Sequence, residues 1–247
     1  MKATRKLIPA FAMLLIAAVM MSTATFAWFS TNATVTATGM SIKATSENTF
    51  VVIKTGDTKP QNSDFTSDNI TADAGMNGAA VSLIPTAAEV DGSSLKWYKG
   101  KSTSSTVSRP EGENGYTETL IDGTIDGIYA VKKTFYVTVL EGFVDADNLV
   151  LSAIEVTGAT VFDDAISVAI VATDGATGAT KVAHVYNDKA ADNTVLDASL
   201  KFGEITTLEV YVFINGRNST VTSANTLLTG ALDAMNITLT FATGTVE

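Results

Sequence analysis

The chain has 247 residues, a formal net charge of −10 and no cysteine. This acidic balance excludes binding to nucleic acid through phosphate contacts, which need clusters of lysine and arginine. Without disulfides the fold depends on its hydrophobic core, and a chain of this length can bury enough apolar surface for a stable one.

The N-terminus has the layout of a secretory signal peptide. A basic region at residues 2–6 precedes an apolar segment at 7–21, and small residues then lead to a cleavage site between Ala27 and Trp28. The apolar segment is short for a spanning helix, which needs roughly 20 apolar residues. We therefore expect a signal peptide at 1–27, removed by a signal peptidase, and a secreted domain at 28–247 with no stable membrane anchor. A retained anchor is the alternative.

The first strand of the secreted part is expected at residues 33–44. Its apolar residues change phase at Gly39: Ala33, Val35 and Ala37 occupy odd positions, whereas Met40 and the apolar residues after it occupy even ones. Such a change indicates a β-bulge or bend at the glycine. A strand that passes from one sheet to another at a corner is the alternative interpretation.

Further along the chain, apolar and polar residues alternate with period two, which is typical of strands with one buried face. The last such segment is the clearest, because Ile237, Leu239 and Phe241 alternate with threonines. Including this one, the predicted strands after the first are 49–54, 95–98, 130–140, 149–157, 165–172, 179–186, 207–214 and 235–242.

Polar segments rich in glycine and serine separate these strands at 55–79 and 99–119, and a third insertion is expected at 187–201. One short helix is expected at 222–233. Many short strands at this spacing predict an all-β fold. We expect a single β-sandwich of jelly-roll type, with loop insertions and one short helix.

The titratable residues form no recognisable catalytic arrangement. His184 is the single histidine of the chain, so a typical zinc site with several histidine or cysteine ligands is excluded. A Ser-His-Asp triad is possible on paper. The favoured interpretation is a half-exposed histidine in a strand, and we expect neither an enzyme nor a cofactor.

Two groups of residues are weaker candidates for binding sites. Asp145, Asp147 and Asn148 offer oxygen ligands for calcium, but they lack the rest of an EF-hand loop, and solvated turns are favoured. Trp97 and Tyr98 have the chemistry to stack on a sugar, although an aromatic residue of a strand is more often part of the core.

The segment TATFAWFSTNATVTATGMSIKA, residues 23–44, resembles the TasA and camelysin family of secreted proteins from Gram-positive bacteria. The signal peptides of that family end similarly, near Ala-Trp/Tyr-Phe, and are removed by a SipW-type signal peptidase. The stretch 208–241 is similar to the closing strands of related clostridial secreted proteins. The middle of the chain, about 55–130, matches no family that we can name.

The resemblance implies a jelly-roll protein of the extracellular matrix or cell surface that assembles into biofilm fibres. In such fibres the N-terminal segment of one subunit completes a sheet of its neighbour. Carried over to this chain, the donor strand is 28–38, containing Ala33, Val35 and Ala37, with Gly39 as the point where it swings out. The implied partners are further copies of the chain and an accessory fibre protein. The metallopeptidase classification of camelysin carries over poorly, because no HExxH motif is present.

A monomeric module for surface adhesion or glycan binding is the alternative function. It would use the polar insertions at 55–79 and 99–119, with Trp97, Tyr98 and Tyr116 near them.

Overall fold

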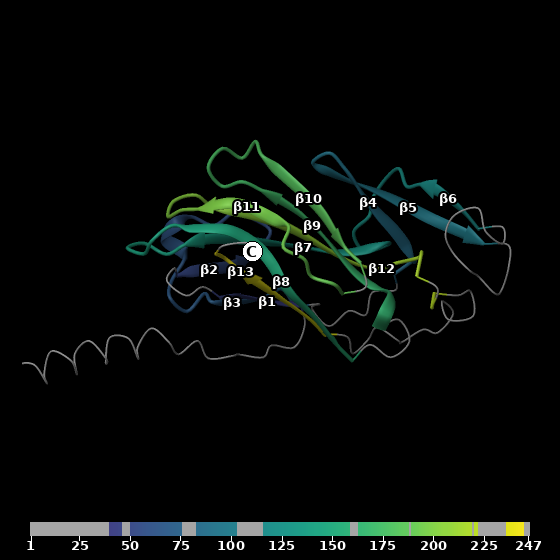
Figure 1. The fold of residues 1–247 in the computed structure, drawn as a ribbon, viewed down its shortest axis with the longest axis horizontal. Helices are drawn as coiled ribbons and strands as arrows, with labels where there is room; N and C mark the ends of the chain where they lie inside the picture. The colour runs from purple at the N-terminus through teal and green to yellow at the C-terminus, as the bar shows by residue number, and fades with distance from the viewer. Residues whose placement is uncertain are drawn as a thin grey trace, which may run out of the picture. The chain divides into compact units, whose positions relative to one another are not determined.

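The computed structural model describes residues 40–45, 50–75, 83–102, 116–158, 163–187, 189–218, 220–221 and 236–244. The chain divides into two units, Met1–Val35 and Thr36–Glu247, and every described residue belongs to the second. The regular secondary structure of its described residues is almost entirely β-strand, which confirms the predicted all-β sandwich (Figure 1). The predicted cleavage site at Ala27 and Trp28, the donor segment 28–38 with Gly39, and the helix at 222–233 lie outside the described residues.

Two five-stranded sheets and one three-stranded sheet make up the described fold. The first sheet has the order β11 (Val195–Leu200), β8 (Ala146–Thr157), β13 (Asn236–Ala242), β1 (Met40–Thr45), β3 (Thr71–Asp73). The second has the order β10 (Lys181–Tyr186), β9 (Ile166–Thr173), β12 (Thr206–Ile214), β7 (Ala130–Val139), β2 (Val51–Thr55). The small sheet is β4 (Thr86–Asp91), β5 (Ser94–Ser102), β6 (Tyr116–Leu120), and 3₁₀ turns occur at Asn62–Asp64 and Asp163–Ala165.

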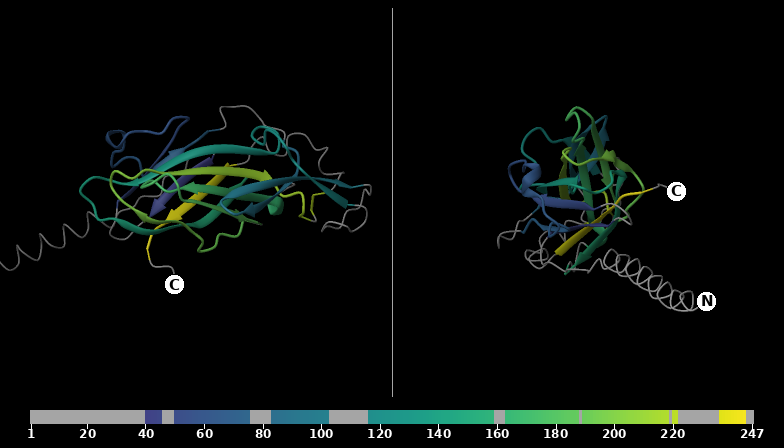
Figure 2. Two further views of the ribbon diagram at one scale, coloured as in Figure 1. Left: turned by 90° about the horizontal axis from the view of Figure 1, so that it is seen from above. Right: turned by 90° about the vertical axis from the view of Figure 1, so that its left-hand side faces the viewer.

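The winding of the two large sheets follows a jelly-roll plan. From β7 to β13 the chain changes sheet at every connection except the hairpin between β9 and β10. The views of Figure 2 show β13, in yellow, and the green strands β9 and β10 from two sides. Strand β13 belongs to the first sheet, whereas β9 and β10 both belong to the second. Strand β1 departs from an all-antiparallel plan, because it pairs in parallel with β13.

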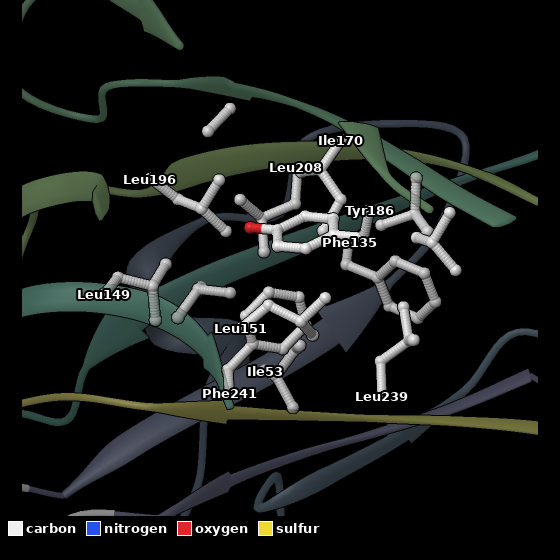
Figure 3. Packing of buried hydrophobic residues seen from close by; sticks show 14 of the residues in the cluster. Ile53, Phe135, Leu149, Leu151, Ile170, Tyr186, Leu196, Leu208, Leu239 and Phe241 are labelled. Atoms are coloured by element: carbon white, nitrogen blue, oxygen red, sulfur yellow. The ribbon is translucent and has the colours of Figure 1, made fainter. Parts of the chain in front are cut away.

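The core lies between the two large sheets, where the inward-facing residues of each strand meet. Ile170, Leu208, Leu239 and Phe241 are buried within one cluster, to which both sheets contribute (Figure 3). In β13 the buried residues alternate with half-buried ones, as the sequence predicts. By contrast, residues Ile166–Ala172 of β9 are all buried, because the small sheet covers part of the outer face of this sheet.

Three strands lie inside segments that were expected to be loops. They are β3 within 55–79, β6 at the end of 99–119 and one residue beyond it, and β11 within 187–201. Strands β3 and β6 are short and polar, and β11 carries the buried carboxylate of Asp197. Local sequence gives little signal for such strands, since they are fixed by backbone pairing with the neighbouring strand and by side chains from distant positions. Thr206, for example, donates a hydrogen bond to Asp197.

Candidate functional site

The described part of the chain leaves one half of a central strand open on one side. On its first side β8 pairs with β13 from Val150 to Thr157. On its second side it pairs with β11 only from Ala146 to Val150. Along Leu151–Thr157, on that second side, no strand pairs with β8 among the described residues. An unpaired strand edge presents rows of N–H and C=O groups to which another strand can bond.

The side chains along this open half of β8 suit an added strand. Ile154 and Val156 are half-buried and pack against the core, whereas Ser152, Glu155 and Thr157 are exposed. From Ala153 to Thr157 the half-buried Ile154 and Val156 therefore share the face toward the core, and a register irregularity at Ser152 separates this stretch from Leu151. A strand that alternates in the same way would match both faces.

The first described strand enters the same sheet at the end where β8 terminates. Met40 pairs with Ile237, and Ile237 pairs with Val156. The chain that precedes Met40 is therefore joined to the sheet at the C-terminal end of β8. This end also carries the open half of β8.

The opposite side of the sandwich is closed by contacts between β2 and the segment before β3. The backbone N–H of Ile53 donates to the carbonyl of Asn69 at 2.7 Å. Strand β3 in turn pairs with β1 through Ser41–Lys43. Consequently this side of the sandwich carries backbone contacts between the strands of the two large sheets.

The candidate calcium ligands lie where β8 begins, in and just before its pairing with β11. Asp147 pairs with Ser199, and its backbone carbonyl accepts a hydrogen bond from Gly244 at 2.8 Å. Asn148 has a positive φ of 52°. Among the described residues no group of three or more histidine or acidic side chains is arranged to hold a metal ion. Calcium binding at Asp145, Asp147 and Asn148 therefore gains no geometric support.

His184 is a half-exposed residue of β10, the environment that was favoured from the sequence. Its Nε2 lies 2.7 Å from Oδ2 of Asp192, and its ring contacts Tyr186 edge-on. Burial acts to raise the pKa of Asp192, but its hydrogen bonds with Thr194 and His184 outweigh this effect and hold that pKa below its usual value. The Thr194 hydroxyl is 3.4 Å from the nearer ring nitrogen. It is also 3.5 Å from the other ring nitrogen, so this hydroxyl lies beside the ring and not opposite Asp192. These contacts attach the segment after β10 to that strand.

The aromatic pair of β5 belongs to the packing of the small sheet. Trp97 is 6% exposed and lies against Tyr211 and Phe213, with ring centroids 5.4 and 5.2 Å away. The guanidinium of Arg217 lies over the ring of Tyr98. These contacts confirm that Trp97 is a core residue, so its ring does not present a face to a sugar. The side chain of Tyr116 lies outside the described residues.

Arg217 is the central charge of this region, and its role was not predicted from the sequence. Its guanidinium donates to both carboxylate oxygens of Glu118, at 2.8 and 2.6 Å, and lies 2.6 Å from Glu89. The hydrogen bond to Glu118 is the main cause of the raised pKa of Arg217. Since Arg217 follows β12 and its partners lie on β4 and β6, the pairs join the small sheet to a large one.

None of the helices in the described segments is long and apolar enough to cross a membrane. Comparison of the chain with models of protein families, with curated proteins and with solved structures gives no significant match. The resemblance to the TasA and camelysin family therefore stays a prediction, carried by residues 23–44 and 208–241.

Proposed function

We propose that this chain is the subunit of a secreted fibre of the extracellular matrix or cell surface. In such a fibre, residues 28–38 of one molecule pair with the open half of β8 in the next. The observation that supports this function best is the edge along Leu151–Thr157, which no strand of the described residues covers. Addition of a strand to such an edge is a recurrent mode of association, since main-chain hydrogen bonds supply affinity and alternate side chains supply register.

The donor segment has the composition and length that this edge requires. Residues 28–38, WFSTNATVTAT, carry no charge and are rich in threonine with a central valine, which favours an extended strand. They reach about 36 Å when extended, whereas the seven-residue edge spans about 23 Å. The segment therefore covers the whole edge and leaves a few residues over at its end.

Pairing within one molecule is disfavoured by the order of the strands. A strand added beside the open half of β8 would lie three strand positions from β1, because β13 and β8 intervene. Three spacings amount to about 14 Å, and Gly39 alone joins the donor segment to β1 at Met40. If the residues next to Gly39, up to Thr38, pair with this edge, they consequently have to come from a second molecule, and repetition of this head-to-tail contact gives a filament.

Cysteine crosslinking tests the pairing directly, since the chain has no cysteine of its own. Val35→Cys in one set of molecules is mixed with Ser152→Cys or Ile154→Cys in another, and assembled material is oxidised. We expect crosslinked dimers for one of these combinations, because neighbouring strands bring paired Cβ atoms within about 5.5 Å. Val35→Cys with Lys181→Cys on β10 is the matched control, which should give no crosslink.

Electron microscopy of the same proteins supplies the second measurement. Residues 28–247 should form filaments, and a version that lacks 28–38 should not. Filaments of the same appearance from both versions would contradict the donor-strand mechanism. If neither version assembles over a range of concentration, pH and salt, the fibre function itself is wrong.

A further inference from the structure

Three loops of the described chain meet beside the C-terminal end of β7 and enclose a hollow of about 510 Å³. They are the segment 61–67 around the first 3₁₀ turn, residues 138–141, and the turn 201–204. The hydroxyl of Thr138 lies 2.9 Å from the carbonyl oxygen of Glu204 and 3.1 Å from that of Lys201. These contacts hold the loops in place, and the volume falls within the range of about 300–1,000 Å³ that is typical of sites for small molecules.

One part of the wall is apolar and aromatic. Phe65 is buried beneath the hollow, whereas Phe202 lies at its rim and is 43% exposed. Leu140 completes this part. The exposed ring of Phe202 offers a flat apolar surface to a ligand.

The rest of the wall is polar, and the described residues that line it include no lysine or arginine, although Nζ of Lys54 lies over the ring of Phe65. Ser63, Thr66 and Ser67 contribute hydroxyl groups, and Glu141 contributes the one carboxylate. Asn62 lies in the same wall, and its side-chain N–H donates to the carbonyl of Gly203 at 3.4 Å.

We propose that this hollow binds a short neutral saccharide. A sugar ring has a C–H face that packs against Phe202 and a rim of hydroxyl groups that bond to the loop hydroxyls and donate to the carboxylate of Glu141. The presence of Glu141 disfavours anionic ligands, and the polar part of the wall disfavours lipid chains. The fibre contact uses the C-terminal half of β8, whereas the hollow lies before β8 begins, so the site does not depend on the proposed fibre.

Saturation-transfer difference NMR tests the proposal, because it observes the ligand whether the chain 28–247 is monomeric or assembled. The panel consists of neutral hexoses, N-acetylhexosamines and their disaccharides, with glucuronic acid as the anionic member. We expect saturable binding of at least one neutral sugar and weaker binding of glucuronic acid. No saturable binding of any neutral member, or tighter binding of the acid, would overturn the proposal.

Variants then locate the site. Phe202→Ala removes the stacking surface and should weaken binding about tenfold, and Ser67→Trp should abolish binding because it fills the hollow. Val144→Ala is the matched control: this residue is 70% exposed on the neighbouring turn and does not line the hollow. Circular dichroism checks that each variant is folded. Binding that stays unchanged in both Phe202→Ala and Ser67→Trp would place the sugar elsewhere and refute the assignment.

Discussion

The hydroxyl group of Tyr186 is the clearest target for a stability experiment. The side chain is 1% exposed, and it projects from β10 into the core near Leu196 and Leu208 (Figure 3). Its oxygen has no hydrogen-bond partner among the described residues. Burying an unsatisfied hydroxyl costs about 1–3 kcal/mol, and Tyr186→Phe removes that cost while it keeps the ring. The small void left behind costs on the order of 0.5 kcal/mol, so we expect a net gain of about 1 kcal/mol.

Thermal unfolding followed by circular dichroism measures this gain. For a domain of this size, 1 kcal/mol corresponds to a rise in Tm of about 2–4 °C. Tyr211→Phe is the matched control, because the Tyr211 hydroxyl is hydrogen-bonded to Lys132 and its loss should not stabilise the fold. A Tm for Tyr186→Phe below that of the natural chain would refute the reasoning, since it would show that the hydroxyl makes a favourable contact.

Tyr186→Phe should also change how the stability of the fold depends on pH above 10. Burial raises the pKa of Tyr186 well above its usual value of about 10. Above pH 10 the unfolded chain therefore releases a proton that the folded chain retains, and the free energy of unfolding falls as pH rises. The Phe variant lacks this group, so its stability should decline less steeply between pH 10 and 12. Equal slopes for the two proteins would contradict the effect of burial.

Three further predictions concern other contacts of the fold. Arg217→Met removes the bidentate partner of the Glu118 carboxylate, which is 3% exposed. The free energy of unfolding, measured with urea, should fall by about 2 kcal/mol. The double variant with Glu118→Gln should recover part of this loss. Gly175→Ala places a Cβ 2.6 Å from the backbone of Ile205, so we expect a loss of at least about 2 kcal/mol, and an unchanged urea midpoint would contradict this contact. Asp192→Asn should lower stability at pH 7 but not at pH 2. The pKa of this carboxyl is lowered in the folded chain, so the carboxyl stabilises the fold only while it is ionised. Equal losses at both pH values would show that the charge of Asp192 does not contribute.

Local alternation of apolar and polar residues was sufficient to predict most of the strands. The predicted segment 235–242 corresponds to β13 at Asn236–Ala242, and 207–214 corresponds to β12 at Thr206–Ile214. The half-exposed position of His184 and the burial of Trp97 also followed from the sequence. These features depend on the residue and its near neighbours, since the side chains of a strand alternate between its two faces.

The candidate sites could not be read from the sequence in the same way. The segment 149–157 was predicted to be a strand, but its open edge follows from the short pairing between β8 and β11. The hollow next to Phe202 requires three loops that are far apart in the chain. Arg217 and Glu118, likewise, lie 99 positions apart. None of these contacts produces a repeating pattern of residue types in the sequence.

The sequence by itself determined that the chain is acidic and lacks cysteine, and that it is built of β-strands with one buried face. The tertiary structure alone decided which of the described strands are neighbours, which half of β8 they leave unpaired and which loops surround the hollow beside Phe202. The physical reason is that alternation fixes the face a side chain occupies, whereas pairing is decided by backbone hydrogen bonds and by burial between segments distant in the chain.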